Sequence, residues 1–163
     1  MRTTLREVTS ADLPLMLAWA HIKEVWKYLP TARHGENLTW ENHWRWWNSR
    51  EQRKDWMIEV DSDDYGFRPV GVVIGNLKSG EIGLYIGETT LWGHGIGLEA
   101  LKRGVVQMGN LGFERIWAVV HPKNKRSQRL FIRAGFTKKG KGRRRQDLYD
   151  IDLRTVVRLK DTD

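Results

Sequence analysis

Two spacings of hydrophobic residues recur along this chain, and they predict a mixture of strands and helices. Alternation at every second position, or a short apolar run between turn residues, predicts strands at 4–8, 55–60, 70–77, 81–87, 113–120, 136–139 and 147–153. Helical spacing behind a capping residue predicts helices at 10–20, 22–29, 39–52, 97–111 and 124–134, with Ser10 and Thr39 as caps of the first and third. Polar stretches predict a loop at 31–38, a turn at 61–68 and a hairpin turn at 78–80.

This order of elements predicts the fold class. A chain of 163 residues suits one domain with a single core, and no repeat or linker divides it. We therefore expect an α+β fold in which one domain, residues 1–163, has a central sheet with helices on both faces.

A glycine-rich turn follows the strand at 81–87. Gly93, Gly95 and Gly97 stand at alternate positions immediately before a predicted helix. Glycine allows positive φ and a close approach of the backbone to a ligand, and a helix start offers unpaired N–H groups, so the segment predicts a phosphate site. A Walker P-loop would need Lys and Ser or Thr where Leu98 and Glu99 stand. A dinucleotide turn would need G-x-G-x-x-G and a carboxylate after the strand at 113–120, which ends without one.

A second segment, residues 124–136, predicts a capped helix that leads into a strand. Asn124 can cap the helix, Leu130 and Phe131 form its buried stripe, and Gly135 can end it before Phe136 begins the strand.

The two segments together resemble the signatures of the GCN5-related N-acetyltransferases (GNAT). Residues 92–97 resemble the turn Gln/Arg-x-x-Gly-x-Gly/Ala, with Trp92 at the first position, and residues 124–136 resemble Asn-x-x-Ser/Ala-x-x-Leu-Tyr/Phe-x-x-x-Gly-Phe. The resemblance covers about 69–153. It implies a mixed sheet with a splayed parallel strand pair, whose wedge admits the pantetheine arm of acetyl-CoA. The implied cofactor-binding residues are Leu84, Tyr85, Ile86, Trp92, Gly93, His94, Gly95, Ile96, Gly97, Asn124, Ser127, Arg129 and Phe131.

The implied reaction is direct attack of an amine on the thioester, because a chain without cysteine cannot form an acetyl-cysteine intermediate. Glu81 is the candidate base, and an ordinary surface carboxylate is the equal alternative. A backbone N–H near Ile86 would stabilise the oxyanion. Phe131 stands where many family members have a Tyr, so Ser127 or Tyr149 could protonate the thiolate, or it could leave unassisted.

Charge and aromatic residues bear on the acceptor. The net charge is +8, which favours an anionic partner such as coenzyme A or a nucleotide-linked substrate. Trp40, Trp44 and Trp47 share one face of the predicted helix, which favours core packing, although an aromatic wall for an acceptor is the alternative. The predicted acceptor-binding residues are Trp19, His21, Trp44 and Trp47. We expect an amino-sugar nucleotide as the acceptor, or else the N-terminal amine of a protein.

The run 138–145 carries six cations, which is typical of a solvated loop. Contact with an anionic acceptor is the alternative, and nucleic acid is a less favoured third. A basic, Trp-rich binding module without catalysis, or a sensor of acyl-CoA, would be the competing class of function. The five histidines lack metal spacing and no apolar run approaches about 20 residues, so we expect no metal, no membrane span and a cytoplasmic location, with a homodimer possible.

Overall fold

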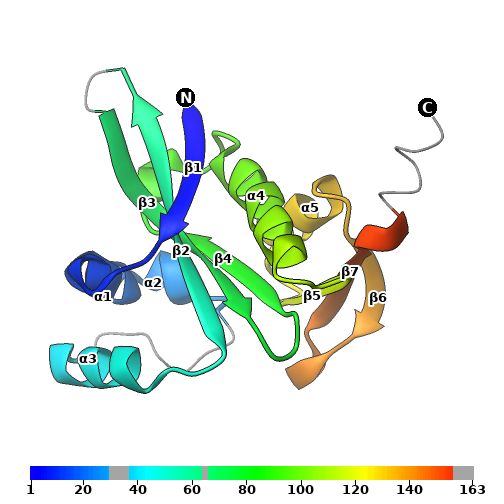
Figure 1. Cartoon of the computed structure of the whole chain (residues 1–163), viewed down its shortest axis with the longest axis horizontal. Helices are drawn as coiled ribbons and strands as arrows, with labels where there is room; N and C mark the ends of the chain where they lie inside the picture. Colours follow the sequence, from blue (N-terminus) through cyan, green and yellow to red (C-terminus); the bar gives the residue numbers. More distant parts are fainter. Residues whose placement is uncertain (30–36, 64–65, 156–163) are drawn as a thin grey trace.

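The computed structural model describes residues 1–29, 37–63 and 66–155 (Figure 1). Its strands are β1 (Arg2–Glu7), β2 (Arg53–Ser62), β3 (Gly66–Asn76), β4 (Ile82–Ile86), β5 (Arg115–Val120), β6 (Thr137–Lys141) and β7 (Asp147–Asp152). Its helices are α1 (Leu13–Ala20), α2 (Lys23–Trp26), α3 (Trp40–Ser49), α4 (Ile96–Asn110) and α5 (Lys125–Arg133), with short 3-10 turns η1 (Ser10–Asp12), η2 (Thr89–Leu91) and η3 (Arg143–Arg145). The loop predicted at 31–38 and the turn predicted at 61–68 lie partly outside the described residues.

The strands form two antiparallel sheets that meet at one point. The first has the order β1-β2-β3-β4 and the second the order β5-β7-β6. In the described part of the chain, a parallel bridge between Glu81 and Trp117 joins β4 to β5, where the Trp117 N–H donates to the Gly80 carbonyl at 3.2 Å. Beyond this bridge the two strands pair with other partners, so the expected splayed parallel pair is present. The expected mixed central sheet is thus made of two antiparallel parts that this parallel bridge joins.

Helices cover both faces of the first sheet, as expected. Alternate residues of β2 point to opposite sides: Ile58 packs in one core with Leu101 and Met108 of α4, while Met57 packs in another with Leu13 and Met16 of α1. Figure 1 shows α4 and α1 on opposite sides of the strands. The site described below therefore lies beside a sheet that is held from both sides.

Several predicted bounds need correction. Thr9, rather than Ser10, precedes the first helical turn, and its N–H donates to the Asp12 carboxylate at 2.9 Å. The helix predicted at 22–29 is only the four-residue α2, and the helix predicted at 39–52 ends at Ser49, because Arg50 returns to extended backbone. Thr39 does cap α3, since its hydroxyl accepts from the Asn42 N–H at 3.1 Å.

One contact fixes α1 against the end of β4. The ring of Trp19 is 2% exposed, and its Nε1 donates to Glu88 Oε1 at 3.2 Å. A Cβ added to Gly87 would stand 2.1 Å from that ring, so only glycine fits there without displacing Trp19. This contact brings α1 close to the turn that follows β4.

Candidate active site

The turn between β4 and α4 has the backbone that its sequence predicts. Gly93 and Gly95 have φ of 84° and 81°, which is the left-handed region that favours glycine. Open space surrounds both, so conformation rather than crowding requires glycine there. Gly95 is the N-cap of the 15-residue α4, whose first N–H groups are available to an anion. Gly97 has ordinary φ, and a Cβ there would only touch Leu130 at 3.7 Å.

The free edge of β4 faces the wedge between the two sheets. The Glu81 carbonyl and the Gly87 N–H both bond to β3, so odd-numbered residues of this strand pair with β3. The backbone groups of Leu84 and Ile86 therefore point to the open edge. Trp92 Nε1 donates to the Ile86 carbonyl at 2.9 Å, which leaves the Ile86 N–H and both Leu84 groups for a ligand.

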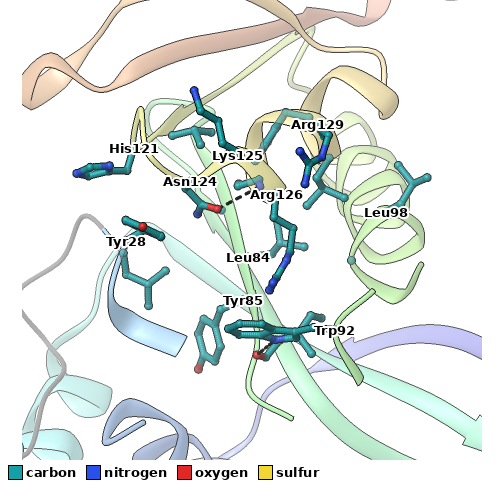
Figure 2. Close-up of a pocket in the computed structure, with 18 of the residues that line it drawn as sticks. Tyr28, Leu84, Tyr85, Trp92, Leu98, His121, Asn124, Lys125, Arg126 and Arg129 are labelled. Atoms are coloured by element: carbon teal, nitrogen blue, oxygen red, sulfur yellow. Dashed lines mark hydrogen bonds between the residues drawn. The ribbon is translucent and has the colours of Figure 1, made fainter. Parts of the chain in front are cut away.

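A cavity of about 760 Å³ fills this wedge. The Asn124 side chain accepts from the Ser127 N–H at 3.2 Å and so caps α5 at the cavity wall (Figure 2). The guanidinium of Arg126 stacks on Trp92 at 4.2 Å from the ring centre, which links the two motifs across the cavity. The cations that line the cavity are Lys27, Lys123, Lys125, Arg126, Arg129 and Arg133. This combination of glycine turn, helix start and cations suits a polyanionic ligand.

The structure brings the predicted cofactor residues together with one exception. Those that line the cavity are Leu84, Tyr85, Ile86, Trp92, Gly93, Gly95, Ile96, Gly97, Asn124, Ser127, Arg129 and Phe131. His94 is exposed and does not line it, because its ring Nδ1 turns toward the Leu91 carbonyl at 3.1 Å.

A second cavity, of about 380 Å³, lies on the α1 and α3 side of β4. Glu81, Gly83, Leu84 and Tyr85 line both cavities, so they form the boundary between them. Glu81 is 19% exposed in its side chain, and its carboxylate accepts from Arg143 Nη2 at 3.0 Å and from Nη1 at 3.4 Å. The candidate base thus stands where the two cavities meet.

The predicted acceptor residues do not line the second cavity. Trp19 is a core residue, and His21 is exposed with its Nε2 2.7 Å from the Leu38 carbonyl. Trp44 is 43% exposed on the outer face of α3, and Trp47 packs beneath the Arg50 guanidinium, 3.4 Å from the ring centre.

Two aromatic residues that line the second cavity, Trp46 and His43, were not among the predicted acceptor-binding residues. Trp46 lines it and stacks on His43 at 5.3 Å between ring centres. The expected core packing of the stripe Trp40, Trp44 and Trp47 is wrong for its first two members, since Trp40 is 46% and Trp44 43% exposed and the two rings stack on each other. The helical pattern alone did not show which face of α3 is turned inward. His43 and Trp46 are three positions apart and so lie on one face of the helix, which was the available signal for this pair.

The hydroxyl groups near the wedge differ in whether they line a cavity. Ser127 lines the first cavity, whereas Tyr149 is buried beside Phe131 and lines neither cavity. Burial raises the pKa of Tyr149. Tyr85 lines both cavities; burial, and secondarily the charge of Asp55, raises its pKa, so it stays protonated at neutral pH. The Tyr85 ring packs edge-on against Trp19, on the α1 side of the sheet.

The basic run at 138–145 is partly ion-paired in the structure. Lys138 and Lys141 both pair with the buried Asp147, and together they hold its pKa below the ordinary value, mainly through the Lys141 contact. Arg143 pairs with Glu81. This segment is therefore attached to the site and is not simply a solvated loop.

Comparison with known proteins decides the family. The model of the acetyltransferase (GNAT) domain matches residues 2–137. The chain belongs to the GNAT acetyltransferase family. The uncharacterized protein MJ1062 of Methanocaldococcus jannaschii is 36% identical to this GNAT chain over 152 residues, 91% of this chain and 31% of that protein. The chain therefore spans about a third of the length of that relative.

Solved structures agree with this GNAT fold. A domain from Methanocaldococcus jannaschii is 34% identical, with a TM-score of 0.84 over 93% of this chain and 99% of that one. The aminoglycoside acetyltransferase AAC(6')-Ib in complex with coenzyme A is 16% identical, with a TM-score of 0.79 over 98% and 99% of the two chains. Spermidine N-acetyltransferase from Vibrio cholerae, in complex with coenzyme A and spermine, is 16% identical, with a TM-score of 0.78 over 95% and 98%. The last two show likeness of fold alone.

In residues 1–29, 37–63 and 66–155, no helix combines the length and apolar character that a bilayer crossing requires. The same residues contain no group of three or more His, Asp or Glu side chains arranged to hold a metal ion.

Proposed function

We propose that this chain transfers the acetyl group of acetyl-CoA directly to a primary amine. The observation that carries the proposal is the pair of cavities that meet at Glu81 and the Leu84–Ile86 edge of β4. One cavity has the anion-binding turn and the cations suited to coenzyme A, and the other is free for an acceptor. Coenzyme A bound to structural neighbours of the same fold supports this assignment.

The chemistry follows from what lies at the boundary. The amine nitrogen attacks the thioester carbon, the C–N bond forms, and the C–S bond breaks. Glu81 accepts the ammonium proton, and the Ile86 N–H, which points to the open edge, donates to the oxyanion. The nitrogen loses its second proton as the amide forms, and the departing thiolate takes up a proton to become the thiol.

An amino-sugar nucleotide is the acceptor that the second cavity favours. Trp46 and His43 offer flat faces to a sugar or base, and Arg143 offers a donor pair to phosphate. The amino terminus of a protein is the second candidate acceptor, since the same cavity is open to solvent and can admit an extended end.

Calorimetric titration with acetyl-CoA at two salt concentrations tests the donor. Micromolar binding is expected, and a folded protein that does not bind would favour a basic binding module instead. A panel of amine-bearing UDP- and CMP-sugars and of ribosomal-protein peptides then tests the acceptor. Glu81→Gln should lower kcat about 100-fold without changing the affinity for acetyl-CoA. Transfer to the peptides alone would rule out the nucleotide sugar.

A further inference from the structure

The turn between β6 and β7 presents an arginine to the candidate base. Arg144 and Arg145 have φ of 54° and 58°, so two adjacent residues with a Cβ adopt the left-handed region. Such conformations cost free energy and persist where the surrounding structure requires them. Here they follow Arg143 directly, and Arg143 is the arginine of this turn that lines the second cavity.

Arg143 engages both carboxylate oxygens of Glu81. Nη2 lies 3.0 Å from Oε1 and Nη1 lies 3.4 Å from Oε2, across 62 positions of sequence. A carboxylate bound in this way has its in-plane lone pairs directed at a guanidinium, so an ammonium group must compete for them. Both oxygens of the Glu81 carboxylate are therefore engaged by Arg143 in this structure.

The Arg143 side chain has room to move away from Glu81. The Arg143 side chain is 49% exposed, whereas that of Glu81 is 19% exposed, so the arginine can turn toward the cavity while the glutamate stays at the start of β4. The other charged or titratable residues that line this cavity are His43, Glu51, Arg53 and Tyr85, and Arg53 is held by the buried Asp55.

We propose that Arg143 is a specificity-determining residue that exchanges Glu81 for an anionic group of the acceptor. A phosphate of the acceptor binds the guanidinium, and this frees the Glu81 carboxylate to accept the ammonium proton. Amines that carry no anion leave the pair closed and react slowly. This inference rests on the proposed acetyl transfer and deepens it by naming a phosphate-bearing amine as the acceptor class.

Titration calorimetry with uridine 5′-diphosphate on the protein saturated with coenzyme A tests the anion site. Arg143→Gln should weaken binding about 10-fold, because a charged hydrogen-bond donor is lost. The matched control is Arg145→Gln, which removes the same charge from the same turn outside the cavity and should change binding less than about 3-fold. Equal effects of the two variants, or no binding of the diphosphate to the unchanged protein, would overturn the proposal.

Kinetics separate this role from a merely structural one. With glucosamine 1-phosphate, Arg143→Gln should raise KM about 10-fold, whereas with glucosamine it should raise kcat, since Glu81 is no longer engaged. An equal fall of kcat for both acceptors would show that Arg143 is a permanent support for Glu81, and would overturn the exchange. Failure of acetyl-CoA to bind any of the three proteins would instead contradict the proposed function.

Discussion

Arg126 and Trp92 meet across the cofactor cavity, with the guanidinium carbon 4.2 Å from the ring centre (Figure 2). One residue comes from the first turn of α5 and the other from the turn before α4. Trp92 is itself held by the Ile86 carbonyl. The ring therefore holds the Arg126 guanidinium at the wall of the cavity.

Arg126→Gln should raise the Kd for coenzyme A about 10-fold, because one charged contact to a phosphate is lost. Lys102→Gln is the control, since Lys102 is exposed on α4 and does not line the cavity. Calorimetric titration measures both variants. The same Kd for both would show that Arg126 does not contact the phosphates.

Gly95→Ala should lower the unfolding free energy by about 1–2 kcal/mol, because its φ of 81° is left-handed. Gly97→Ala should cost less than about 0.5 kcal/mol, since its φ is ordinary and its added Cβ only touches Leu130. Urea denaturation compares them. Equal losses of unfolding free energy in the two variants would show that the left-handed φ of Gly95 is not the reason for glycine at that position.

Gly87→Ala should destabilise the fold by about 3 kcal/mol, because the new methyl would overlap the Trp19 ring. Gly83→Ala is a matched change on β4, where no atom lies within 4 Å of the added carbon, and it should be nearly neutral. Denaturant midpoints of the two variants measure the difference. A near-neutral Gly87→Ala would mean that Trp19 can shift without loss.

Asp12 predicts a dependence of stability on pH. Its carboxylate accepts from Arg6 Nη1 and Nη2, both at 2.8 Å, and from the Thr9 N–H at 2.9 Å. The Arg6 contact first, and the Thr9 N–H in addition, lower the pKa of Asp12. The unfolded pKa is about 3.9, so the unfolded chain binds more protons near pH 4. The stabilisation is complete above about pH 4 and is lost as pH falls through the lowered native value.

Asp12→Asn should therefore reduce the unfolding free energy at pH 7 by about 1 kcal/mol, discounted because Arg6 is 38% exposed. In this variant, the unfolding free energy should also fall less steeply as the pH is lowered below 4. Urea unfolding from pH 2.5 to 7 tests this. Glu41→Gln, which removes an exposed pair with Arg45, should leave the profile unchanged, and an identical acid slope in Asp12→Asn would refute the assignment.

Sequence predicted the parts of the site that depend on neighbouring residues. The conformation of Gly93 and Gly95 and the Asn124 cap are local properties, and both were confirmed. The partner of Glu81 could not be predicted, because Arg143 is 62 positions away and reaches it only through the β6–β7 turn. The choice of Trp46 over the exposed Trp44 depended on how α3 packs against α1 and the core beside it, which the sequence does not show.

The division of the strands into two sheets has a thermodynamic consequence. In the described residues, β4 and β5 share a single parallel bridge, so the wedge beyond it has no backbone pairing of its own. A ligand that fills the wedge and binds only the folded chain adds about 2.7 kcal/mol to the unfolding free energy at 100 times its Kd. The acyl donor would then stabilise the folded structure as well as react, so the midpoint of unfolding would rise with its concentration.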